Sequence, residues 1–387
     1  MIHDLFLTNI HIGKVRHLEN FDIMLSGHER KHLILTGKNG SGKTSLLDAM
    51  KDIVTRQTQN SVVAGKVDPL RRTADYPGLY DVAVVEHDLE LSYNNPDAHV
   101  HEFIFVHIPA ERQKITKPVA IAPVEIKGKT SIVTNAGSEF LKYILSLDYR
   151  LYGAKADGNI KLVESLEKWF TDFQARLREI YDCQKLTLQR DTKNLAFQIV
   201  LPGYEPFGLN QMADGYYALL NIVMELLLRM DDDNSVVNYE KSGIVFVDEI
   251  ETHLHVKLQK KVLPFLTEIF PNIQFIVTTH SPFVISSLKN AVVYDLEKKD
   301  FLEEPSQYSY ETIVEAYFDT DMYSDKIKAV FKRYQELYSK ERTTVENEEF
   351  FKVKTDLELV PPASKELYFA FREMENKRKA ASNNGNR

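Results

Sequence analysis

The stretch LILTGKNGSGKTSLLDAM, residues 33–50, decides the fold class of this 387-residue chain. It begins with apolar residues typical of a strand, passes through a glycine-rich turn and continues with the apolar spacing of a helix. The glycines let the backbone curl so that successive N–H groups face a phosphate, and the helix adds partial positive charge at its N-terminus. Lys43 can then reach the β and γ phosphates, and Thr44 can ligate Mg²⁺. We therefore predict a phosphate-binding loop made of Gly37, Lys38, Asn39, Gly40, Ser41, Gly42, Lys43, Thr44 and Ser45.

Acidic and polar residues follow two further apolar strands. The strand at residues 244–247 delivers two carboxylates at its carboxyl end, where ligands bind in open α/β sheets. We predict that Asp248 holds Mg²⁺ and that Glu249 polarises the attacking water as the general base. The strand at residues 273–277 runs into TTHSP, which places His280 where its side chain can hydrogen-bond a γ-phosphate. Adjacent acids at a strand end are common in proteins, so these assignments depend on the loop upstream.

The composition excludes several classes of protein. With 56 acidic and 48 basic side chains the formal charge is −8, so no whole-molecule positive field attracts nucleic acid, and any DNA contact must be a local patch. The single cysteine, Cys183, cannot form an internal disulfide or a thiolate metal site. The most apolar stretch, residues 216–228, is interrupted by Asn221 and Glu225, and the N-terminus lacks a signal-peptide pattern. We expect a cytoplasmic protein without a membrane span.

The order of strand and helix patterns predicts an α/β fold, with a mixed sheet that has a parallel core and antiparallel N-terminal strands. Alternating patterns at residues 82–92 and 100–107 predict one antiparallel pair. We divide the chain into a lobe with the phosphate-binding loop (1–135), a helical-hairpin insertion (136–183), a lobe with the acidic pair and His280 (184–300), a helical C-terminal subdomain (301–380) and a disordered tail (381–387).

The second arm of the predicted hairpin carries apolar residues at spacings of three and four: Val163, Leu166, Phe170, Phe173, Leu177 and Ile180. The stripe covers fewer than three heptads and about 35 Å of helix, too short for a long coiled coil. Internal packing and a partner surface are both open explanations of this stripe.

Three motifs in this order resemble the ABC-type P-loop ATPases, specifically the soluble SMC, RecF and OLD-like branch. The resemblance covers the chain in patches to about residue 296 and is carried by LILTGKNGSGKTSLLDAM (33–50), IVFVDEIETHLH (244–255) and FIVTTHSPFVI (275–285). It implies a fold built as an ATPase head, ATP and Mg²⁺ as ligands, and hydrolysis of ATP to ADP and phosphate. By the same resemblance the Walker A pair is Lys43 and Thr44, the Walker B pair is Asp248 and Glu249, and the switch histidine is His280.

The family also carries a signature loop that completes the nucleotide site of a partner subunit. Ala213, Asp214 and Gly215 occupy its place here, and we call them the signature loop. Ala213 stands where the family has a serine whose hydroxyl bonds the γ-phosphate. Losing this hydrogen bond removes about 2 kcal/mol of stabilisation of the ATP site, so we expect slow ATP turnover or weak closure of the dimer. The family's glutamine loop points to Gln113 as a contact of Mg²⁺ or its water, with Arg112 as an alternative local cation.

The resemblance implies a homodimer in which ATP on Lys43 of one protomer is capped by the signature loop of the other. The C-terminal helices are candidates for building higher oligomers. Within this branch the chain looks more like the stand-alone ATPase subunits of anti-phage systems of the Septu type, which work with a separate HNH nuclease, than like OLD proteins. We expect this because residues 301–387 lack the acidic strand motifs of an OLD nuclease. Two alternatives stay open. One is a RecF-like DNA-repair ATPase that binds DNA directly, with the lysines of residues 114–129 as its basic patch, and the other is a scaffold that binds ATP without turnover.

Overall fold

The chain folds as two compact units, Met1–Ile313 and Val314–Arg387. The structure is a computed structural model that describes residues 4–59, 88–95, 103–112, 136–191, 196–230, 239–310, 312–314, 325–340, 342–358 and 370–376. The first unit ends at Ile313, after the short turn of helix η4 (Pro305–Gln307), rather than at residue 300. Its further division into two lobes and an insertion stays a prediction.

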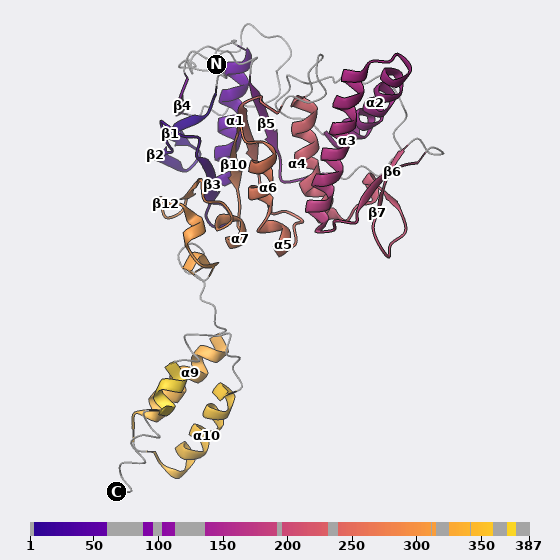
Figure 1. Ribbon diagram of the computed structural model, residues 1–387. Coiled ribbons are helices and arrows are strands. Elements are labelled where there is room, and N and C mark those ends of the chain that lie inside the picture. Colours follow the sequence, from indigo (N-terminus) through magenta and orange to yellow (C-terminus); the bar gives the residue numbers. More distant parts are fainter. Residues whose placement is uncertain are drawn as a thin grey trace. The chain divides into compact units, whose positions relative to one another are not determined.

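A six-stranded sheet forms the centre of the first unit, in the order β12-β11-β3-β10-β9-β5 (Figure 1). The strands are β3 (His32–Thr36), β5 (Ile104–Ile108), β9 (Gly243–Val247), β10 (Ile273–Thr278), β11 (Ala291–Asp295) and β12 (Asp300–Glu303). All neighbours are parallel except β12, which is antiparallel to β11 at the edge. Every residue of the parallel strands is buried. A parallel sheet needs both faces covered, and this explains the continuous apolar runs in these strands.

A second, antiparallel sheet has the order β2-β1-β4. It consists of β1 (Leu7–Val15), β2 (Leu18–Met24) and β4 (Asp88–Tyr93). The antiparallel pair that we expected from residues 82–92 and 100–107 is wrong, because β4 pairs with β1 while β5 lies parallel to β9. β4 alternates between buried and more exposed residues and suits a half-covered sheet, whereas β5 is buried throughout and needs the interior of the main sheet.

Helices connect and cover the two sheets (Figure 1). α1 (Lys43–Gln59) contacts β10 of the main sheet and also β1 and β4, so it lies between the sheets. α4 (Asp214–Met230) contacts β5 and α2, and all of its residues from Tyr217 to Met230 are buried. The shorter helices that follow β9 and β10 are α5 (Val256–Gln259), α6 (Val262–Ile269) and α7 (Pro282–Ile285).

A helical hairpin of α2 (Ala136–Ala156) and α3 (Ile160–Tyr181) precedes a small antiparallel sheet of β6 (Thr187–Asp191), β7 (Ala196–Val200) and β8 (Phe207–Gly208). The stripe on α3 is internal packing. Trp169 is buried in it and stacks on Phe173 with ring centroids 5.2 Å apart. Phe170, which we had placed in the stripe, instead stacks on Phe197 of β7 at 5.4 Å.

The second unit has its own small core. It contains α9 (Asp325–Tyr338), α10 (Thr344–Glu358) and a helical segment at residues 370–376. Tyr334, Phe350 and Phe371 pack at its centre, and the Tyr334 hydroxyl donates to Glu375 at 2.6 Å. Among the described residues of both units, none of the helices has the length and apolar character of a membrane span. The tail at residues 381–387 lies outside the described residues.

His32, the first residue of β3, gives the fold a pH-dependent contribution to stability. Its buried Nδ1 accepts a hydrogen bond from the Phe275 N–H at 3.0 Å. Burial, helped by the nearby charge of Arg30, lowers the pKa of His32 to about 4. The pKa in the folded state is below that in the unfolded state, so this contribution is complete above about pH 6.5 and is lost as the pH falls towards 4.

We expect the free energy of unfolding to fall by about 2.5 kcal/mol between pH 7 and pH 4.5 through His32. His32→Asn keeps a hydrogen-bond acceptor and does not titrate in this range. Urea denaturation of both proteins at the two pH values measures the difference. The variant should lose about 2.5 kcal/mol less than the natural protein. Equal losses would show that His32 is not a source of the pH dependence.

Candidate nucleotide-binding site

The three predicted motifs meet at one edge of the main sheet. Since β3, β9 and β10 are parallel neighbours, their carboxyl ends lie at the same edge. The phosphate-binding loop follows β3, Asp248 and Glu249 follow β9, and His280 follows β10. Ligands bind at such an edge in open α/β sheets.

The phosphate-binding loop is wrapped around its own lysine. Lys43 is buried, and its Nζ donates to the carbonyl oxygens of Gly37 at 2.8 Å and Lys38 at 3.1 Å. Gly37 has φ +133°, and a Cβ there would lie 2.8 Å from the Ser41 Oγ, so only glycine fits. Because α1 begins at Lys43, the loop also presents the N-terminus of a helix.

Carboxylates surround Lys43. Burial lowers its pKa, and the charges of Glu249, Glu251, Asp248 and Asp295 partly offset this effect. In this setting the Lys43 ammonium group is desolvated, and its present partners are the carbonyl oxygens of Gly37 and Lys38. A triphosphate would provide stronger, charge-assisted acceptors for the same donors.

A hydrogen-bonded contact joins the phosphate-binding loop to the acidic strand end. The Thr44 hydroxyl donates to Asp248, with distances of 3.0 Å to Oδ2 and 3.2 Å to Oδ1. Thr278, at the end of β10, donates to Asp248 Oδ1 at 2.6 Å and accepts the Glu249 N–H at 2.7 Å. Reasoning from the sequence gave Thr278 no role, and the only signal for it is a polar residue at the end of an apolar strand.

These oxygens fit Mg²⁺. The ion prefers hard oxygen ligands, and in nucleotide sites it takes one or two protein carboxylates together with phosphates and water. Thr44 and Asp248 supply such a set. No group of three or more His, Cys, Asp or Glu side chains that could hold a metal occurs among the described residues. Thr44 and Asp248 would thus supply one hydroxyl and one carboxylate to an ion that also binds phosphates.

Glu249 has an unusual backbone conformation at the start of the acidic turn, which we define as residues 248–253. Its φ is +42°, a left-handed value that costs a non-glycine residue about 1–3 kcal/mol. The N–H is held by Thr278, and the carbonyl oxygen accepts from Arg112 Nη2 at 3.2 Å. The side chain accepts a hydrogen bond from the Thr252 hydroxyl at 3.3 Å. Hydrogen bonds to the backbone N–H, to the carbonyl oxygen and to the side chain thus hold the Glu249 carboxylate in place.

Arg112 holds the acidic turn through its backbone. Besides Glu249, it donates to the carbonyl oxygens of Asp248 at 3.0 Å and Ile250 at 3.4 Å. Burial lowers its pKa to about 10, which still leaves it charged near neutral pH. These three bonds fit a positioning role for Arg112, and its role as a cation for the nucleotide stays a prediction. Gln113, the predicted magnesium contact, lies outside the described residues.

Replacing Arg112 by alanine should lower kcat by about 10- to 100-fold with a smaller change in KM, because small displacements of a catalytic group have effects of this size. Arg112→Lys keeps the charge and part of the donor capacity, so it should recover part of kcat. Steady-state ATPase kinetics and thermal unfolding of both variants test this. A folded Arg112→Ala protein with unchanged kcat would contradict the positioning role.

Glu251 and His280 form a second contact at the same edge. The Glu251 Oε1 accepts the backbone N–H of His280, and its Oε2 is buried with no hydrogen-bond partner among the described residues. Burial lowers the pKa of His280, and the charge of Lys43 lowers it further, while Glu251 and its neighbours oppose the shift. His280 is therefore mainly neutral at pH 7. Reasoning from the sequence missed Glu251, although it is the third acid in the segment DEIE.

The signature loop lies at the other end of the acidic turn. Ala213 precedes α4, and Asp214 and Gly215 are its first residues. A Cβ on Gly215 would lie 2.7 Å from the His253 carbonyl oxygen, so glycine permits close packing of the two segments. No residue of the signature loop is among the groups that interact with Lys43 in the described structure.

The chain resembles proteins of known families over part of its length. The family model "AAA domain, putative AbiEii toxin, Type IV TA system" matches residues 130–286. The "Retron Ec83 probable ATPase" of Escherichia coli is 28% identical over 165 residues, which cover 38% of this chain and 30% of the relative. Septu protein PtuA of Bacillus mycoides (strain KBAB4) is 33% identical over 95 residues, 24% of this chain and 13% of that protein. The chain thus spans less than a third of the length of either relative.

Among solved structures, an Smc head bound to the C-winged helix domain of ScpA aligns over 75% of this chain and 93% of its own, with 13% identity and a TM-score of 0.41. Over these parts of its length the chain is therefore similar to an AAA-domain family model, to the retron Ec83 probable ATPase and to Septu PtuA.

Proposed function

We propose that this chain binds ATP with Mg²⁺ between the phosphate-binding loop and the acidic turn, and hydrolyses it to ADP and phosphate. The observation that carries the proposal is the contact between Thr44 and Asp248. It joins a hydroxyl and a carboxylate from two distant motifs, and both are ligands that Mg²⁺ prefers. When bound, the ion would offset negative charge on the β and γ phosphates.

In the proposed mechanism Lys43 exchanges its loop carbonyls for phosphate oxygens. Glu249 accepts a proton from a water molecule, whose oxygen attacks the γ phosphorus as the bond to the bridging oxygen breaks. The electron pair of that bond leaves on ADP. Neutral His280 orients the water or the γ-phosphate by a hydrogen bond, and Arg112 and Thr278 keep the Glu249 peptide in place.

We further propose that ATP bridges two copies of the chain. The proposal is supported by the signature loop, which is not among the groups that interact with Lys43 in the described structure and could contact phosphates bound to a second copy. The Glu249→Gln variant should shift from monomer to dimer in sedimentation velocity when ATP and Mg²⁺ are added. Lys43→Ala should stay monomeric under the same conditions. A Glu249→Gln protein that binds ATP and remains monomeric would contradict the bridged dimer.

The resemblance to ATPase subunits of Septu-type anti-phage systems, together with the sequence matches to Septu PtuA and the retron Ec83 probable ATPase, supports a role in defence against phages. We propose that the chain acts in the cytoplasm as a regulatory ATPase of such a system and controls a separate HNH-type nuclease. Purification of the tagged chain, co-expressed with its neighbouring genes, should recover that nuclease. The nucleotide state should change its recovery or its cleavage of DNA. Recovery of no nuclease, together with salt-sensitive DNA binding by the isolated chain, would favour the RecF-like alternative.

A further inference from the structure

Two short helices begin directly after the catalytic motifs, and the proposed mechanism uses neither of them. α5 follows the acidic turn, and α7 follows His280 with Ser281 as its N-cap. The two helices contact each other (Figure 1). This contact therefore joins the segment after the acidic turn to the residue that follows His280.

Gln259, the last residue of α5, makes the hydrogen bonds of this contact. Its Oε1 accepts from the Ser281 hydroxyl at 2.7 Å, and its Nε2 donates to the Leu254 carbonyl oxygen at 2.7 Å. Since a carbonyl oxygen can only accept, the NH₂ end of the amide must face Leu254, which leaves the oxygen for the Ser281 proton. Leu254 follows the acidic turn, and its own N–H donates to the Glu251 carbonyl oxygen at 2.8 Å. We name the two bonds of the Gln259 side chain the amide bridge.

The Ser281 hydroxyl has no spare bonding capacity. Ser281 is buried, and its Oγ accepts the N–H groups of Phe283 at 3.2 Å and Val284 at 3.3 Å. A hydroxyl has one proton and two lone pairs, so these two bonds and the donation to Gln259 use all of them. Without Gln259, the hydroxyl proton and the carbonyl oxygen of buried Leu254 both lose this partner, and the start of α7 is held less tightly.

His280 depends on its backbone for its direction. The imidazole forms no hydrogen bond with any residue that the structure describes. The backbone on either side is held at three points. Glu251 accepts the N–H of His280, the Thr279 Oγ1 accepts the N–H of Ser281 at 3.0 Å, and the amide bridge binds the Ser281 side chain. The bridge is the one of these three contacts that reaches α5.

The general base is anchored independently of the amide bridge. The N–H of Glu249 is bound by Thr278, and its carbonyl oxygen by Arg112. The acidic turn is thus the fixed side of the contact, and the start of α7 is the side that the bridge holds. Loss of the bridge should displace His280 and leave Glu249 in place.

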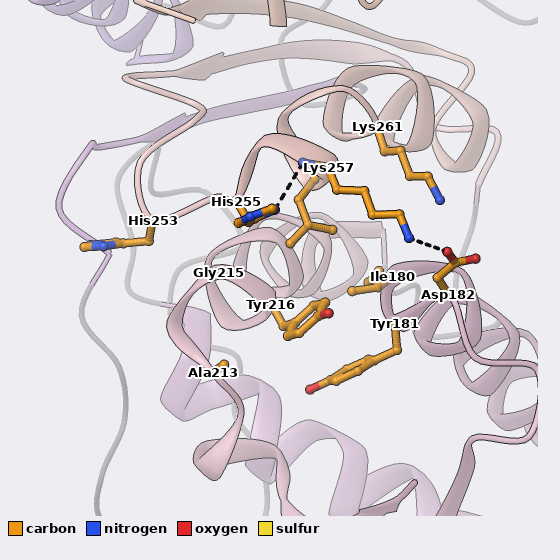
Figure 2. A pocket seen from close by; sticks show the side chains of 11 residues that line it. Ile180, Tyr181, Asp182, Ala213, Gly215, Tyr216, His253, His255, Lys257 and Lys261 are labelled. Atoms are coloured by element: carbon orange, nitrogen blue, oxygen red, sulfur yellow. Dashed lines mark hydrogen bonds and ion pairs between the residues drawn. The ribbon is translucent and has the colours of Figure 1, made fainter. Parts of the chain in front are cut away.

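The amide bridge is also separate from the pocket that lies beside α5. This pocket has a volume of about 240 Å³, and its lining residues on α5 are Lys257 and Leu258, not Gln259 (Figure 2). His255, the N-cap of α5, lines it too, and its Nδ1 accepts the Lys257 N–H at 3.4 Å (Figure 2). A substitution of Gln259 therefore changes the contact with α7 without removing a wall of the pocket.

We infer that Gln259 is a positioning residue for ATP hydrolysis, which holds His280 against the end of the acidic turn through the Ser281 hydroxyl. The inference rests on the proposed function, because it requires that His280 orient the attacking water or the γ-phosphate. The amide bridge makes no contact with the phosphate-binding loop. Its effect should therefore fall on turnover and not on the affinity for ATP.

Replacing Gln259 by alanine should lower kcat by about 10- to 100-fold, because small displacements of a group at the reacting centre have effects of this size. KM should change by less than about threefold. Gln259→Glu keeps the acceptor for Ser281 and loses the donor to Leu254, so it should recover part of kcat. Gln335→Ala makes the same change on an exposed face of α9 and should leave kcat unchanged. Thermal unfolding establishes that each variant is folded.

A double-mutant cycle with His280→Ala tests whether Gln259 acts through His280. Once the imidazole is absent, its position no longer matters, so adding Gln259→Ala should lower kcat by no more than about twofold further. If the two losses in kcat multiply, Gln259 acts on another group and the inference is overturned.

Hydrogen exchange tests the amide bridge in the absence of nucleotide. Peptides from residues 279–287 should exchange about tenfold faster in Gln259→Ala than in the natural protein, because the loss of one hydrogen bond lets the start of α7 open more often. Peptides of α9 should exchange at the same rate in both proteins. Equal exchange at residues 279–287 would show that the bridge does not hold this segment, and would overturn the inference.

The two proposals fail in different ways. If the natural protein hydrolyses ATP and a folded Gln259→Ala protein does so at the same rate, the role of Gln259 is wrong and the proposed function stands. If the natural protein binds ATP and never hydrolyses it, the proposed function is wrong and the role of Gln259 in hydrolysis falls with it.

Discussion

Replacing Glu249 by glutamine is expected to lower the ATP turnover number by about two to four orders of magnitude, the range that a general base contributes. Glutamine has nearly the same shape and cannot accept the proton of the attacking water. The backbone contacts with Thr278 and Arg112 do not involve the carboxylate, so the acidic turn should keep its conformation. ATP should remain bound, and release of phosphate under single-turnover conditions measures the loss.

Glu164→Gln is a matched control, because Glu164 is exposed on α3 and the substitution changes charge and shape in the same way. It should leave turnover unchanged. If Glu249→Gln hydrolyses ATP at the natural rate, another group is the general base. If the natural protein and the variant are equally inactive while both bind ATP, the chain is a scaffold rather than a hydrolase.

Replacing Lys43 by alanine should weaken ATP binding by at least about 100-fold. The Nζ now donates two hydrogen bonds to loop carbonyls, and the phosphates would receive the same donors. Two charge-assisted bonds at about 1.5–3 kcal/mol each correspond to a loss of this size or larger. The variant also leaves the carboxylates near Lys43 without their buried cation, which adds repulsion towards the incoming phosphates.

Fluorescence titration with a labelled ATP analogue and Mg²⁺ measures this loss. Lys14→Ala is the control, because Lys14 is an exposed residue of β1 that pairs with Glu19. Its affinity for ATP should match that of the natural protein. Unchanged affinity in a folded Lys43→Ala protein would place the nucleotide elsewhere on the chain.

The sequence predicts the parts of the site that are formed by residues adjacent to one another in the chain. The phosphate-binding loop can be predicted from residues 37–45 alone, because the glycines, the lysine and the start of the helix that bind phosphate all occur within these nine residues. The strands before Asp248 and His280 are fully buried, so each appears in the sequence as a short, nearly continuous apolar run that predicts a strand. Their common edge follows from the parallel order of an α/β fold.

The parts that the sequence did not predict depend on contacts between distant residues. Nothing local to Arg112 indicates that it would meet the carbonyls of residues 248–250, and nothing local to Thr278 indicates its bond to Asp248. The partner of β4 was missed for the same reason, since an alternating pattern gives the exposed face of a strand and not its neighbour. On α3, Trp169 and Phe170 are adjacent and both apolar, and only the packing of α2 and β7 decides which of them lies in the stripe.

The central claim is that the phosphate-binding loop and the acidic turn together hold ATP. Isothermal titration calorimetry of the natural protein with ATP and Mg²⁺ tests it most directly. Saturable binding of one ATP per chain that requires Lys43 is the predicted result. A folded protein that gives no heat of binding at any accessible concentration, and no displacement of a labelled ATP analogue, would contradict the claim.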